Sequence, residues 1–97
     1  MLSMIYDFDA LRRRREAIGA VAARHGATDV RVFGPVLRGE TPGGIDLLVD
    51  MAGDRSLLDL AALWRDLEAL LDHEVNLLTL GGLTDRDAGI VDEAVLL

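Results

Sequence analysis

The sequence predicts an α+β fold, in which a small mixed sheet of three to four strands has flanking helices. Two apolar runs, residues 30–33 and 45–51, are separated by a loop rich in glycine and proline, as expected of strands joined by a turn. A leucine-rich helical segment follows the second run and leads to a third apolar run at residues 74–80. A helix between two apolar strands indicates a right-handed crossover and a parallel pair. The length suggests one domain, residues 1–97.

The first helix is predicted to begin after Asp9, its N-cap, and to end at His25, with Gly26 as the terminating residue. Residues 27–29 are predicted to form a turn before the first strand. The apolar residues of this helix share one face: Leu11, Ile18, Val21 and Ala22.

The second helix is predicted to begin at Ser56, because Ser56 and Asp59 have the spacing of a capping box. Trp64 lies within its apolar face and is predicted to belong to the core. Thr84 and Asp87 predict a cap for a last helix. That helix is expected to contain Ile90, Val91, Ala94 and Val95. The apolar C-terminal residues would either complete the core or contact a partner.

The charge and composition exclude several classes of function. A net charge of −7 argues against direct nucleic-acid binding. The basic run Arg12 to Arg15 does not change this, because consecutive residues point around all sides of a helix. Cysteine is absent, and His25 and His73 are too few for a histidine metal site. No apolar run reaches about 18 residues and no signal peptide is recognised, so a cytoplasmic location without membrane contact is expected.

Four short motifs in a fixed order carry a family resemblance. VRVFG, LRGE, IDLLVD and EVNLLTL resemble the minimal nucleotidyltransferases (MNT domains) of the polymerase-β superfamily, over residues 11–97. The resemblance implies the nucleotidyltransferase fold and a site with a Gly-Ser corner, two carboxylates in a D-x-D pattern and a third carboxylate on the following strand. In such a site, the three acids hold two Mg²⁺ ions that bind a nucleoside triphosphate.

This sequence departs from that pattern at the residues that would contact phosphate and metal. Pro35 stands at the serine position, Gly44 at the first acid of D-x-D, and Asn76 at the third acid. Asp46 remains as a residual catalytic and metal-binding candidate. Asp50 is about 13 Å along the strand from Asp46, too far to share metals about 4 Å apart. Glu74 begins the third strand and is also an unfavourable substitute.

Three further residues match the family pattern as weak nucleotide contacts: Gly34, Arg38 and Gly39. Asp46 has an alternative interpretation as a structural acid held by Arg38 or by loop N–H groups. No cofactor is expected, and Mg²⁺ with ATP would be needed only if residual activity exists.

The resemblance also implies a partner, because these proteins commonly act as antitoxins of HEPN-domain ribonuclease toxins. The sequence therefore predicts a catalytically impaired, antitoxin-like module that neutralises a HEPN-type toxin by direct contact, rather than an enzyme. Two alternatives stay open: an active Mg²⁺-dependent nucleotidyltransferase that moves AMP from ATP onto a partner, and a subunit that completes a larger transferase. Either homo-oligomers or hetero-oligomers are compatible with the sequence.

Overall fold

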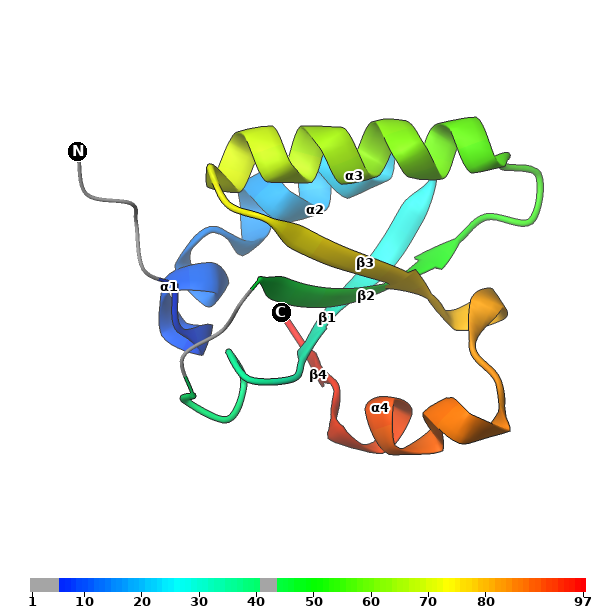
Figure 1. The fold of residues 1–97 in the computed structure, drawn as a ribbon. Coiled ribbons are helices and arrows are strands. Elements are labelled where there is room, and N and C mark those ends of the chain that lie inside the picture. The colour runs from blue at the N-terminus through cyan, green and yellow to red at the C-terminus, as the bar shows by residue number, and fades with distance from the viewer. Residues whose placement is uncertain (1–5, 41–43) are drawn as a thin grey trace.

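The computed structural model describes residues 6–40 and 44–97, which form a four-stranded mixed sheet in the order β3-β2-β1-β4. Figure 1 shows α3 on one side of the sheet, with α2 behind it, and α4 on the other side. The predicted α+β class and the mixed sheet are therefore confirmed. The predicted loop between the first two strands falls partly on residues 41–43, which lie outside the described ranges, as do residues 1–5.

The predicted first helix is two helices, α1 (Phe8–Arg13) and α2 (Arg15–Arg24). Asp9 was the wrong N-cap: the side chain of Asp7 accepts a hydrogen bond from the Ala10 N–H at 2.7 Å, so the helix begins earlier. The chain bends at Arg14, whose guanidinium donates to the Tyr6 hydroxyl. The predicted apolar face is confirmed, because all four of its members are buried: Leu11, Ile18, Val21 and Ala22.

Strand β1 (Ala27–Phe33) begins three residues earlier than predicted, so the expected turn at residues 27–29 is wrong. A shift in register between Thr28 and Arg31 accommodates Asp29, whose φ of 53° is left-handed. Strand β2 (Ile45–Met51) matches its prediction and pairs with β1 in antiparallel fashion.

Helix α3 (Leu57–Leu71) connects β2 to the parallel strand β3 (Val75–Thr79), which confirms the predicted helical connection and parallel pair. The predicted capping box is present, with Ser56 and Asp59 satisfying each other's backbone N–H groups. Trp64 was wrongly assigned to the core. Its side chain lies at the margin, 37% exposed, because its indole N–H donates to the carbonyl of Val75 instead.

The C-terminal segment differs most from prediction. After the 3₁₀ turns η1 (Leu80–Gly82) and η2 (Asp85–Asp87), helix α4 (Ala88–Glu93) ends before Val95. Val95 and Leu96 form β4, which pairs with β1. The apolar periodicity predicts a longer helix, because an edge strand of two residues is too short to show a sequence pattern of its own. The Thr84–Asp87 capping box is present, but it caps the 3₁₀ turn η2 that leads into α4, not α4 itself.

The main core lies between the sheet and the helices α2 and α3. Strand β2 contributes Ile45, Leu47 and Val49, each fully buried. Its alternate residues face the opposite side, because successive side chains of a strand point in opposite directions. Among the described residues, no helix is long and apolar enough to span a membrane.

Candidate functional site

The corner after β1 requires glycine at position 34. Gly34 has φ +78°, and a Cβ there would lie 2.2 Å from Oδ2 of Asp46. The chain then makes a helical turn, in which the N–H groups of Leu37 and Arg38 approach the Gly34 carbonyl at 3.1 and 3.3 Å. Gly39, with φ +75°, follows in open space. Asp46 and the backbone corner are thus in close contact.

The positions predicted from the D-x-D pattern meet on one face of the sheet. Asp46 and Asn76 are register partners in β2 and β3, and Asn76 Nδ2 donates to Asp46 Oδ1 at 2.9 Å. A Cβ at Gly44 would lie 3.0 Å from the same Nδ2 atom. The fold therefore brings residues 34, 44, 46 and 76 together, as the spacing of the motifs predicts.

Asp46 is held by a different partner than the one considered from sequence. Arg38 does not reach Asp46: it pairs with Glu40 at 2.7 Å and with Glu93. Hydrogen bonds to Glu40 and then to Glu93 raise the pKa of Arg38 above its ordinary value. The amide of Asn76 takes the place of Arg38 because it lies directly opposite Asp46 across two paired strands.

This set of residues does not fit a pair of Mg²⁺ ions. Magnesium prefers several oxygen ligands, commonly carboxylates, whereas the cluster offers one carboxylate with an amide N–H₂ directed at it. Within residues 6–40 and 44–97, no three His, Cys, Asp or Glu side chains gather into a possible metal site. Asp50 and Glu74 are both exposed, and the main chain of Glu74 accepts the Ile45 N–H at 2.9 Å.

Two residues of this region were missed in the sequence. Glu93, at the end of α4, accepts a hydrogen bond from the Gly34 N–H at 3.3 Å. Arg31 pairs with Leu48 and Leu96 in the sheet, and its Nη1 atom is buried without a hydrogen-bond partner among the described residues. Spacing could not identify Glu93, because it lies 59 residues from Gly34. Arg31 belongs to none of the spacing patterns of the family motifs.

Comparisons with known proteins support the nucleotidyltransferase fold. No protein-family model matches the sequence. A Methanocaldococcus jannaschii protein named "Putative protein adenylyltransferase MJ0435" is 37% identical over 81 residues, which span 77% of this chain and 84% of that protein. A solved structure titled "Structure of putative minimal nucleotidyltransferase" is 45% identical, with a TM-score of 0.81, over 94% of this chain and 96% of the other.

Proposed function

Because the chain belongs to the minimal nucleotidyltransferase family, we propose that it is an antitoxin-like binding module that neutralises a HEPN-type ribonuclease by contact, without catalysis. The cluster at Asp46 carries the proposal. Asp46 is the only acid among positions 44, 46 and 76, and its Oδ1 accepts the Asn76 amide. A single carboxylate that already accepts a hydrogen bond cannot supply the several ligands needed by two metal ions that bridge a triphosphate.

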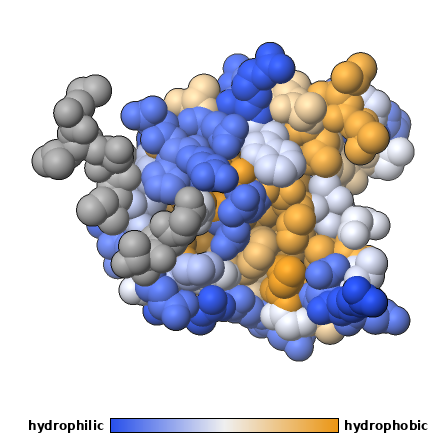
Figure 2. All heavy atoms as spheres, viewed as in Figure 1, coloured by the Kyte–Doolittle hydropathy of each residue, from blue (hydrophilic) through white to orange (hydrophobic). Residues whose placement is uncertain are grey.

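The surface supports binding to a protein. Figure 2 shows apolar residues gathered between α3 and α4. Several large apolar side chains of β3, α4 and β4 are at least one-third exposed: Leu78, Val91, Val95 and Leu96. Apolar side chains of this kind form the centre of many protein interfaces. In addition, a net charge of −7 favours a basic partner such as an RNA-cleaving enzyme.

A second candidate function is transfer of AMP from ATP to a partner protein in the presence of Mg²⁺. The name of the M. jannaschii relative favours it, because that protein is described as a protein adenylyltransferase. This candidate requires Mg²⁺-dependent ATP binding. Calorimetry that detects no heat with Mg²⁺ and ATP, together with an unchanged mass of the partner, would exclude it.

The test of the main proposal is co-expression with the product of the neighbouring gene. The native chain is compared with a restored variant that carries Pro35→Ser, Gly44→Asp and Asn76→Asp. The native chain should bind the partner and relieve its toxicity as well as the restored variant does. Failure of the native chain to bind, or neutralisation by the restored variant alone, would contradict the proposal.

The restored variant changes three positions at once, so a matched control is needed. Arg13→Gln combined with Arg24→Gln makes the chain more negative by two charges, as the two new aspartates do, at exposed side chains of α1 and α2, and leaves positions 35, 44, 46 and 76 unchanged. Equal folding of all three proteins is checked by thermal unfolding. A difference in neutralisation can then be attributed to the cluster at Asp46.

A further inference from the structure

Strand β3 forms one edge of the sheet, with β2 on its other side. The Ile45 N–H donates to the Glu74 carbonyl at 2.9 Å, so this carbonyl points toward β2. Because the backbone groups of successive residues in a strand point to opposite sides, those of Val75, Leu77 and Thr79 point away from β2. These three residues present their N–H and C=O groups at the outer side of the sheet.

Helix α3 covers the first of the three residues. The carboxylate of Glu68 accepts the Val75 N–H at 3.1 Å, and the indole N–H of Trp64 donates to the Val75 carbonyl. Within the described residues, no helix, turn or loop accepts a hydrogen bond from the N–H of Leu77 or Thr79. Unpaired backbone groups at a sheet edge are a template for pairing with another chain. The open edge of β3 therefore extends from Leu77 to Thr79.

A hollow of about 220 Å³ follows this open edge. Its lining combines Leu60 of α3, Leu78 of β3, and Leu83 and Asp87 of the C-terminal segment. Figure 2 shows apolar side chains on this face of the molecule, between α3 and α4. When a segment is added to a sheet, backbone hydrogen bonds hold it, and hollows beside the edge receive its alternate side chains. The open edge provides both features.

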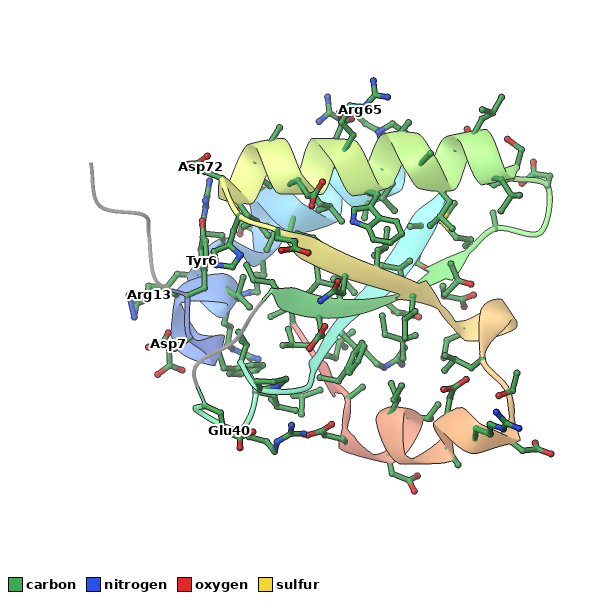
Figure 3. All side chains as sticks on the ribbon, viewed as in Figure 1. Tyr6, Asp7, Arg13, Glu40, Arg65 and Asp72 are labelled. Carbon is green, nitrogen blue, oxygen red and sulfur yellow. The ribbon has the colours of Figure 1, made fainter. Side chains whose placement is uncertain are left out.

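The charge beside the hollow is negative. Asp87 is the charged side chain among the described residues that line it, and β3 (Val75–Thr79) is uncharged. One carboxylate oxygen of Asp87 accepts hydrogen bonds from the Thr84 N–H and hydroxyl at 2.9 and 3.2 Å. Arg65 points away from the sheet (Figure 3), and Arg86 is exposed and does not line the hollow. A basic side chain therefore complements this end of the hollow.

A second copy of the chain is a poorer occupant than a different protein. It would bring a net charge of −7 to a chain of the same charge, and its own β3 has no base to place beside Asp87. An extended segment that alternates apolar side chains and carries a lysine or arginine meets both requirements. The contacts and the charge therefore favour a basic partner protein.

We propose that an extended segment of the partner ribonuclease pairs with the open edge of β3 as an added strand. The segment places apolar side chains in the hollow and a lysine or arginine beside Asp87. Its pairing stops at Val75, whose backbone groups are already bonded to Glu68 and Trp64. This inference rests on the proposed contact with a ribonuclease, and it assigns the surface at which that contact is made.

Hydrogen exchange of the native chain, alone and in complex with the product of the neighbouring gene, tests the added strand. The amides of Leu77 and Thr79 should exchange about tenfold or more slowly in the complex, because each gains a hydrogen-bond acceptor. The Val75 amide is the internal control, since Glu68 already accepts its hydrogen bond in the free chain. Its exchange rate should change by less than about threefold.

Two acids of the turn η2 provide matched variants for the basic contact. Asp87→Asn keeps an oxygen acceptor for Thr84 and removes the charge at the hollow, so the dissociation constant of the complex should rise about fivefold. Asp85→Asn makes the same change at an exposed side chain that does not line the hollow, and should alter the dissociation constant less than about twofold. Equal effects of the two substitutions would overturn the contact between Asp87 and a base.

The outcomes for the complex separate strand addition from the proposed function. A stable complex in which the exchange of Leu77 is unchanged would overturn strand addition, but not neutralisation by contact. Absence of a complex would overturn both. If the chain alone shows slower exchange of Leu77 as its concentration rises, a second copy pairs with β3, and the added strand of the ribonuclease is overturned.

Discussion

The two faces of strand β2 differ in the side chains that they carry. Toward the helices, Ile45, Leu47 and Val49 are fully buried in the core. Toward the other side, the same strand presents Asp46, half-buried, and Asp50, exposed, on either side of the buried Leu48. One face is therefore apolar and packed along its length, whereas the other carries polar side chains on both sides of one buried leucine. Gly44 and Asn76, which replace two acids of the family pattern, lie beside Asp46 on the second face, away from the packed core.

The largest effect is expected on the packed face. Leu67 and Leu58 both lie on α3, but Leu67 is fully buried and Leu58 is 81% exposed. Leu67→Ala should lower the free energy of unfolding by about 2–5 kcal/mol, because it leaves a cavity. Leu58→Ala should change it by no more than about 0.5 kcal/mol. Urea unfolding measures both, and equal losses would contradict the assignment of the core.

A smaller loss is expected at the corner on the polar face. Gly34→Ala should cost about 2–3 kcal/mol, since it adds left-handed strain and displaces Asp46 from Asn76. Gly39→Ala adds the same left-handed backbone strain, but its new Cβ would meet no other atom, so the free energy of unfolding should fall by about 1–2 kcal/mol. In an Asp46→Ala background, the difference between the two glycine substitutions in urea unfolding should shrink, because only the Cβ of residue 46, at 3.3 Å, remains close to a Cβ at position 34. An undiminished difference would mean that the Asp46 carboxylate is not the obstacle.

The N-terminus of α3 shows how much a capping box adds to the stability of the packed face. Ser56→Ala removes the acceptor for the Asp59 N–H and should lower the free energy of unfolding by about 1 kcal/mol. Leu57→Ala is the neighbouring control, because Leu57 is 83% exposed. A thermal melt in which both variants behave alike would show that the capping box contributes little.

The smallest effect concerns acid pH. The Ser56 N–H donates to Asp59 at 2.9 Å and lowers the pKa of that carboxyl below its ordinary value. The charged form is favoured in the folded chain, so its stabilisation is present above the unfolded pKa and is lost as pH falls through the folded pKa. Stability should therefore decrease below about pH 4, and less steeply in Asp59→Asn. An equal decrease in the urea midpoint of both proteins as the pH is lowered would contradict this role of Asp59.

Most of the packed face could be predicted from sequence. The bounds of β2, the capping box of α3 and the parallel crossover follow from apolar periodicity and spacing, which packing enforces. Trp64 was misplaced because periodicity shows which residues are apolar, but not that an indole N–H seeks the Val75 carbonyl at the margin. Strand β4 was missed because its pairing with β1 is a long-range contact.

The polar face could be predicted only in part. Family motifs located Gly34, Gly44, Asp46 and Asn76, and the structure places these residues together. The motifs did not identify the contacts among them. Glu93 reaches the corner from the opposite end of the chain, and local sequence carries no signal for a pairing across 59 residues.

Neutralisation by contact alone is tested most directly by inhibition of RNA cleavage by the neighbouring gene's product, with a metal chelator and no nucleotide present. The native chain and Asp46→Ala are compared at equal concentrations. Both proteins should inhibit the ribonuclease equally, with no change in its mass. Inhibition that requires Mg²⁺, ATP and Asp46, and that accompanies addition of AMP to the ribonuclease, would contradict it.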